Sequence, residues 1–240
     1  MQGLLTAAGV TSVFHYAPLH YLLFIARSKA LFSKVELRRL GYDPFHFRRT
    51  SRRQDEARGF SNYVHLTLSQ FPPILEAKLR AGFPHFEIQV PAKDLEQRDF
   101  RLCRFNIARS RYLRRQEKSG PPENPVNGRY YGDKQLPTAE TAEECRALLA
   151  ENLGRRMIEV LIPVTLPLPT NTTLIFFSTD DLNLAEDALR RMRLDEWTLQ
   201  LAPDASYIQD AQHVADVQRF LRTAEANANW RGDGLDFDSV

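Results

Sequence analysis

The chain of 240 residues lacks the marks of several large protein classes. It has only two cysteines, Cys103 and Cys145, and their spacing from each other and from the histidines matches no metal site. No stretch approaches the roughly 18 apolar residues of a membrane-spanning helix. No basic residue precedes the apolar part of the N-terminus, which is therefore a poor signal peptide. These absences predict a cytoplasmic protein with reduced structural cysteines, no metal and no membrane association.

Several nucleotide-binding and catalytic motifs are also missing. The sequence has no GxGxxG after an expected strand, no P-loop, no HExxH and no GxSxG. Rossmann dinucleotide-binding enzymes, P-loop NTPases, zinc proteases of the HExxH type and α/β-hydrolases are therefore set aside. The hydrophobic share of 43% and the charged share of 26% are ordinary for a globular protein.

What is present is the mixed pattern of an α+β protein without repeats. Helices are expected at 18–28, 72–82, 138–154 and 180–194, and strands at 12–17, 61–69, 85–91, 100–108, 157–163 and 172–179. Thr138 is expected to cap the third of these helices, with a glutamate three residues after Thr141. The long Pro-, Gly- and Asn-rich stretch at 119–137 is a loop. No linker separates two cores, so we expect one domain over 1–240, with its core at about 13–200 and a loose tail at 230–240.

Charge is distributed unevenly along the chain. Residues 1–120 hold 21 Lys and Arg against 10 Asp and Glu, a balance of +11, whereas residues 121–240 have a balance of −9. Two basic runs, at 48–58 and 101–115, are interleaved with aromatic residues. Arginines neutralise phosphates and aromatic rings stack on bases, so this combination suits a nucleic-acid surface. A solvated positive face or a patch for an acidic protein partner remains an alternative.

One glutamate stands out in an apolar strand. Glu159 interrupts the apolar run MIEVLIP. Burying an ionised carboxylate costs free energy, so such a residue is expected only where it is paired or has a function. Its neighbours at a spacing of two, Met157 and Leu161, are apolar, which argues against an ordinary solvent face and for a cleft. A second candidate is His15, which lies near the end of the first strand and is followed by an aromatic residue. Strand glutamates and histidines are, however, often structural.

The order of these segments resembles DarT-type DNA ADP-ribosyltransferases, a family of bacterial toxins, over about residues 13–182. The segments that carry the resemblance are VFHYAPLHYLLFIARSKALFS, then RRTSRRQDEARGFSNYVHLTLSQFPPIL, then HFEIQVPAKDL with RFNIARS, and finally the 119–137 loop followed by RRMIEVLIP. They are similar in turn to the family's histidine strand and helix, its arginine loop and YVPFYF segment, its next strand, its substrate loop and its AEFLVP glutamate strand. The stretch SNYVHLTLS departs from the family's more usual DYVPFYF.

This resemblance implies an ADP-ribosyltransferase-like α+β fold, with a central mixed or antiparallel sheet split around an NAD cleft and flanked by helices. It also implies an activity, the transfer of ADP-ribose from NAD to a thymine or guanine base of single-stranded DNA. NAD would be consumed as a substrate, nicotinamide would leave, and no metal would be needed. The expected partners are single-stranded DNA and an antitoxin that hydrolyses ADP-ribose, of the macrodomain type or a related one.

The resemblance also implies roles for particular residues. Glu159 would grip a ribose hydroxyl and face the positive charge that develops when the bond to nicotinamide breaks. Arg52 or Arg53 would meet the diphosphate, with Arg49 the next choice, because a guanidinium fork suits phosphate oxygens. The remaining NAD-binding residues would be His15, Tyr16 and Tyr63, although Tyr63 is equally well explained as a core aromatic. The residues expected to contact DNA are Arg111, Arg114, Arg115, Asn124, Asn127, Arg129, Tyr130 and Tyr131.

Two other functions remain open from the residues alone. A non-enzymatic module that binds single-stranded nucleic acid would explain the basic half but not Glu159. An ADP-ribosyltransferase that acts on RNA or protein would keep Glu159 and His15 but would need a different substrate loop.

Overall fold

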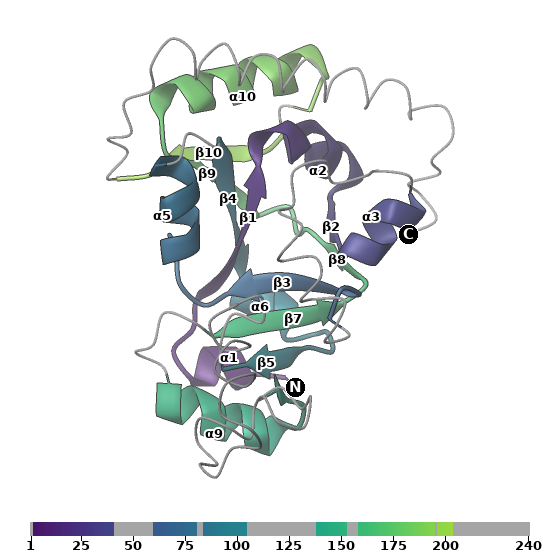
Figure 1. Ribbon diagram of the computed structural model, residues 1–240, viewed down its shortest axis with the longest axis vertical. Helices are drawn as coiled ribbons and strands as arrows, with labels where there is room; N and C mark the ends of the chain where they lie inside the picture. The colour runs from purple at the N-terminus through teal and green to yellow at the C-terminus, as the bar shows by residue number, and fades with distance from the viewer. Residues whose placement is uncertain are drawn as a thin grey trace, which may run out of the picture. The chain divides into compact units, whose positions relative to one another are not determined.

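The computed structural model describes residues 2–40, 60–80, 84–104, 138–152, 158–194 and 196–203 (Figure 1). The chain divides into two compact units, each assembled from three stretches of sequence. The first unit takes residues 1–11, 32–69 and 92–166, and the second takes residues 12–31, 70–91 and 167–240. Because the stretches alternate along the chain, no single cut separates the units. That the whole chain is one domain stays a prediction.

The second unit contains a mixed set of four strands. Their order is β10 (Thr198–Leu201), β9 (Thr173–Phe176), β4 (His85–Pro91) and β1 (Ser12–Pro18). β10 and β9 run parallel, and the other two pairs are antiparallel. The described helices of this unit are η1 (Leu19–Tyr21), α2 (Leu22–Ser28), α5 (Pro73–Arg80) and α10 (Thr179–Arg191). In Figure 1, α5 and α2 lie on opposite sides of β1 and β4.

The first unit contains four strands that are all antiparallel to their neighbours. Their order is β3 (Tyr63–Thr67), β7 (Glu159–Pro163), β5 (Arg101–Cys103) and β6 (Thr138–Ala139). Among the described residues of this unit, the helices are α1 (Leu4–Ala7), α3 (Lys34–Arg39), α6 (Ala92–Leu95) and α9 (Ala142–Asn152). The boundary between the units falls within the two short strands β2 (Ala30–Phe32) and β8 (Thr165–Pro167).

The helices begin where capping side chains satisfy the free N–H groups of the first turn. The hydroxyl oxygen of Ser178 accepts a hydrogen bond from the N–H of Asp181 at the start of α10, at 3.1 Å. At α9, Thr141 and Glu144 form a reciprocal capping box, with distances of 3.2 and 3.0 Å. The prediction that Thr138 caps this helix is wrong. Thr138 lies in β6 opposite Cys103, because the capping box already fixes the first turn three residues later.

The expected start of the first helix also needs correction. A helix was expected from Pro18 onwards, but Pro18 is the last residue of β1, with the extended angles φ −58° and ψ 142°. The 3-10 turn η1 follows, and the α-helix α2 begins only at Leu22. The other expected strands and helices are found within a few residues of their predicted bounds, as far as the described residues extend. The α+β class is confirmed.

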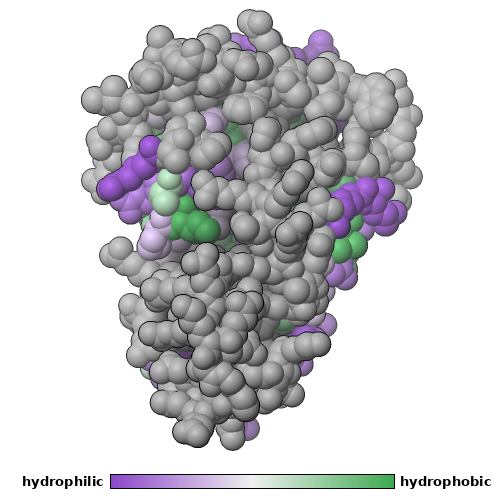
Figure 2. Space-filling model, in the orientation of Figure 1, coloured by the Kyte–Doolittle hydropathy of each residue, from purple (hydrophilic) through white to green (hydrophobic). Residues whose placement is uncertain are grey.

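The described surface combines charged side chains with isolated apolar ones. Figure 2 shows, on one face, hydrophilic residues in purple beside smaller hydrophobic areas in green. The large apolar side chains that are exposed are Val35, Ile74, Val164 and Leu201. Single exposed apolar residues of this kind are ordinary in globular proteins. Within the described ranges, no helix is long and apolar enough to cross a membrane.

Candidate functional site

Glu159 is the first residue of β7, not the centre of a strand as its position in the sequence suggested. It lies opposite Thr67, the last residue of β3, and opposite Cys103, the last residue of β5. The carboxylate is buried, with Glu159 only 8% exposed. The side chain is therefore held where the ends of three strands meet.

The two faces of β7 explain why an apolar run contains this carboxylate. Successive side chains of a strand point to opposite faces. Val160 and Ile162 therefore share one face, and they lie opposite Leu66 and Val64 of β3 in a buried apolar layer. Glu159 points to the other face, so the apolar layer is complete without it.

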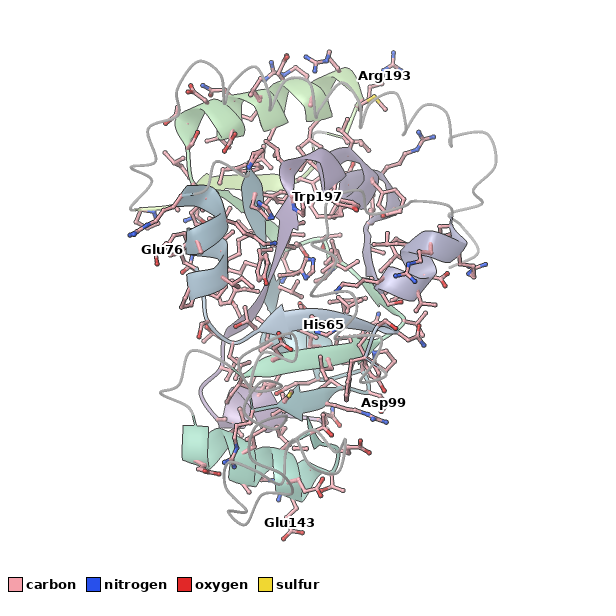
Figure 3. The ribbon with its side chains drawn as sticks, viewed as in Figure 1. His65, Glu76, Asp99, Glu143, Arg193 and Trp197 are labelled. Carbon is pink, nitrogen blue, oxygen red and sulfur yellow. The ribbon has the colours of Figure 1, made fainter. Side chains whose placement is uncertain are left out.

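The face that carries Glu159 also carries His65 of β3, which is labelled in Figure 3. The Nδ1 atom of His65 lies 3.4 Å from Oε2 of Glu159, and its Nε2 atom lies 3.1 Å from the carbonyl oxygen of Phe60. His65 was not among the residues expected at the site. The sequence did indicate its position, because the two-residue spacing of Tyr63, His65 and Thr67 places them on one face of β3.

Apolar and aromatic side chains surround the rest of this face. Phe60, Cys103 and Leu161 form a buried cluster against which Tyr63 packs. The guanidinium carbon of Arg101 lies 5.5 Å from the centre of the Tyr63 ring, a cation–π distance. These contacts agree with the interpretation of Tyr63 as a packing aromatic. Its contact with the nicotinamide side of NAD stays a prediction.

Arg101 also forms an ion pair with Glu140, with its NH1 atom 2.7 Å from Oε1. Both side chains are partly exposed, so the pair contributes little to stability and mainly limits where the guanidinium can point. Arg101 belongs to the second basic run, which was assigned to nucleic acid from its composition. In the structure, the guanidinium of Arg101 contacts the Tyr63 ring and forms an ion pair with Glu140.

The other two described candidates, His15 and Tyr16, lie in the second unit, on β1. His15 is opposite Ile88 and Tyr16 is opposite Glu87, both on β4. Because they are consecutive strand residues, their side chains point to opposite faces. The two rings are nevertheless nearly parallel, with centroids 6.3 Å apart. A shared role of both rings in holding NAD stays a prediction.

Tyr16 is surrounded by ionisable side chains that the sequence did not indicate. Nζ of Lys78 lies 4.9 Å from the centre of its ring and 3.2 Å from Nε2 of His85. Glu87, directly across the strand pair, is fully buried, and its Oε1 accepts a hydrogen bond from the N–H of Phe71 at 2.9 Å. Burial raises the pKa of Glu87 to about 7, against the opposing effect of that hydrogen bond.

The remaining candidates lie outside the described residues. They are Arg49, Arg52 and Arg53, and further along the chain Arg111, Arg114, Arg115, Asn124, Asn127, Arg129, Tyr130 and Tyr131. The expected 119–137 loop and the 230–240 tail also fall there, as does Met157. Among the residues that the structure does describe, no group of three or more His, Cys, Asp and Glu side chains could hold a metal ion.

The sequence matches no described protein family and no curated protein. The fold, in contrast, is similar to that of DarT from Thermus sp. 2.9. The comparison with the structure of that protein bound to NAD+ gives a sequence identity of 13% and a TM-score of 0.52. It covers 82% of this chain and 97% of that chain. Its structure with ADP-ribosylated single-stranded DNA gives 13% identity and a TM-score of 0.54 over 82% and 96%. The predicted ADP-ribosyltransferase fold, as found in DarT, is confirmed.

Proposed function

We propose that this chain is an NAD-dependent DNA ADP-ribosyltransferase, which transfers ADP-ribose from NAD to a base of single-stranded DNA. The observation that carries the proposal is Glu159, a buried carboxylate next to His65 at the start of β7, in a fold shared with DarT. DarT from Thermus has been solved with NAD+ and with ADP-ribosylated single-stranded DNA. Both the proposed substrate and the proposed product class of this chain are taken from those complexes.

Transfer of ADP-ribose from NAD requires a carboxylate of this kind. The bond between the nicotinamide nitrogen and C1′ of the ribose breaks, and nicotinamide leaves as a neutral molecule with the bonding electrons. Positive charge then develops on the ribose, as in glycoside cleavage. A carboxylate held in advance near that charge stabilises the transition state more than the ground state. The base nitrogen forms the new bond to C1′ and loses its proton, which Glu159 would accept.

Burial and support by neighbouring strands prepare Glu159 for this role. Its backbone is paired on both sides, to Thr67 of β3 and Cys103 of β5, so the side chain starts from a fixed position. Charges interact more strongly at a buried position than in water, because the surroundings are less polarisable. A surface glutamate with the same contacts would be a weaker electrostatic catalyst.

Residues other than Glu159 would hold the two substrates. His15 and Tyr16 would contact NAD, and one guanidinium among Arg49, Arg52 and Arg53 would bind its diphosphate. The 119–137 loop and the arginines at 111, 114 and 115 would hold the DNA strand. The balance of +11 over residues 1–120 supports a polyanionic partner. We further propose that the protein acts in the cytoplasm as a toxin, paired with an antitoxin that hydrolyses ADP-ribose.

The direct test is incubation of the full chain with NAD and single-stranded oligonucleotides that contain thymine, guanine or neither. The expected result is release of nicotinamide and a mass gain of one ADP-ribosyl unit on one of the first two oligonucleotides. Glu159→Gln should abolish both signals, whereas Glu143→Gln, on the exposed side of α9, should leave them unchanged. No modification of any oligonucleotide by the wild-type chain would refute the proposed function, and transfer to RNA or protein alone would replace its substrate.

A further inference from the structure

The turn before β3 holds one carbonyl oxygen in a fixed position. The carbonyl oxygen of Phe60 accepts a hydrogen bond from the N–H of Tyr63 at 3.2 Å, which closes the turn. Asn62, inside the turn, accepts a backbone hydrogen bond from Val164 at 2.9 Å, and its Oδ1 accepts one from the hydroxyl of Ser33 at 3.3 Å. Two segments distant in sequence, at Ser33 and at Val164, therefore fix the turn, and with it the Phe60 carbonyl.

That carbonyl determines which nitrogen of His65 carries a proton. A carbonyl oxygen only accepts hydrogen bonds, so the 3.1 Å contact requires a proton on Nε2. The opposite ring nitrogen, Nδ1, faces Oε2 of Glu159 at 3.4 Å. Two unprotonated acceptors would repel each other at this distance. The contact is favourable only when a proton lies on Nδ1 or on Oε2.

The groups around the pair are consistent with one retained proton. Thr67 lies opposite Glu159 on one side and the thiol of Cys103 lies opposite it on the other. The other ionisable groups of these strands on the same face are Tyr63 and Arg101, and the guanidinium of Arg101 is engaged by Glu140. The imidazole of His65 is a partner of Glu159 that can exchange a proton with it near neutral pH.

We propose that His65 is a positioning residue for Glu159, and that the two side chains share one proton between Nδ1 and Oε2. The catalytic consequence of this inference rests on the proposed function. The hydrogen bond fixes the rotation of the carboxylate, and thereby orients its second oxygen, Oε1. Loss of the shared proton at alkaline pH would remove the hydrogen bond and release the carboxylate from this orientation.

The proton itself can be observed without any substrate. In the full chain labelled with 15N, the imidazole signals of His65 would be followed across pH by NMR, with the five other histidines as internal references. We expect Nε2 to stay protonated, and the titration midpoint of His65 to fall by about one pH unit or more in Glu159→Gln, because the negative partner is lost. An unprotonated Nε2 at neutral pH, or an unchanged midpoint in Glu159→Gln, would overturn the inference.

Kinetics then tests the positioning role. His65→Gln should lower kcat by about tenfold to a hundredfold, the range expected when a reacting group is misplaced. It should change the KM for NAD by less than about threefold. The wild-type kcat should fall at alkaline pH as the shared proton is lost, and this fall should disappear in His65→Gln, which a merely structural role of His65 would not produce. Glu143→Gln serves as the matched control with wild-type kinetics.

The two proposals fail in different ways. If the wild-type chain transfers nothing to DNA while the NMR result holds, the function is wrong and the shared proton remains. If transfer occurs but His65→Gln keeps the wild-type rate or the alkaline fall, the positioning role is wrong and the function remains. If His65→Gln does not fold, the titration of His65 in Glu159→Gln still decides whether the proton is shared.

Discussion

The stability of the second unit should depend on pH through the buried carboxyl group of Glu87. Glu87 lies within the unit with one oxygen bonded to the N–H of Phe71, and its Oε2 has no hydrogen-bond partner among the described residues. Burial disfavours the charged form of a carboxyl group, so Glu87 binds its proton more tightly in the folded protein than in the unfolded chain. The folded state therefore gains stability from the neutral form.

The size of the effect follows from the two pKa values. The pKa of Glu87 rises from 4.5 to about 7, and each pH unit is worth 1.36 kcal/mol, so the full effect is about 3 kcal/mol. For a raised pKa, this stability is complete below the pKa of the unfolded chain and is lost as the pH rises through the folded pKa. Most of the loss, about 2.5 kcal/mol, should occur between pH 5 and pH 8.

Glu87→Gln isolates this contribution. The amide is neutral at every pH, and its oxygen can still accept the hydrogen bond from Phe71. Urea unfolding at pH 5 and pH 8 should show that the variant gains about 2.5 kcal/mol of unfolding free energy relative to the wild type over that interval. Glu186→Gln, at an exposed position of α10 in the same unit, controls for the removal of a carboxylate. A relative change below about 0.5 kcal/mol in Glu87→Gln would refute the reasoning from burial.

Three further results are expected. Glu159→Ala should keep the fold and lower the transfer rate by about 10² or more, and a variant that transfers at the wild-type rate would exclude Glu159 from catalysis. Binding of single-stranded DNA should weaken steeply as the salt concentration rises. Duplex DNA should be modified poorly, because unstacking a base costs a few kcal/mol. Equal modification of duplex and single-stranded DNA would exclude the proposed role of the 119–137 loop. Arg52→Ala or Arg53→Ala should raise the KM for NAD and leave oligonucleotide affinity largely intact, whereas Arg114→Ala should lower the salt slope of DNA binding by about one. If neither the Arg52 nor the Arg53 variant alters NAD kinetics, the diphosphate clamp lies elsewhere in the 48–58 run.

The sequence predicted the elements with strong local signals. Strand β4 was expected over residues 85–91 and is found with those bounds, because its alternating apolar residues pair with strands on both sides. The start of α9 was expected three residues too early, since two threonines offered a capping hydroxyl and only Thr141 is matched by a glutamate three residues later. The strand β2 and the helix α3 were not expected, because their three and six residues show too little periodicity.

The candidate site was only partly predictable, for a related reason. The anomaly of Glu159 is local, since one carboxylate interrupts an apolar run. Its contact with His65 joins residues 94 positions apart and depends on the register of β3 against β7. The alternation within β3 indicates which face His65 lies on, but not which residue of β7 it will meet, because that depends on pairing with a distant strand. The burial of Glu87 is likewise set by the strands on both sides of β4 and by the turn at Phe71.

The stretches of the two units alternate along the chain, and this has a consequence for folding during synthesis. Strand β3 pairs with β7, and β4 pairs with β9, so each unit needs residues from both ends of the sequence. Pairing over such separations forms late and requires closure of long loops. A nascent chain that stops before residue 159 lacks both β7 and β9, and can complete neither unit. Neither unit could thus form its strand pairs before β7 and β9 have been synthesised, and a gene cut anywhere between β4 and β7 would encode two fragments, neither of which contains a complete unit.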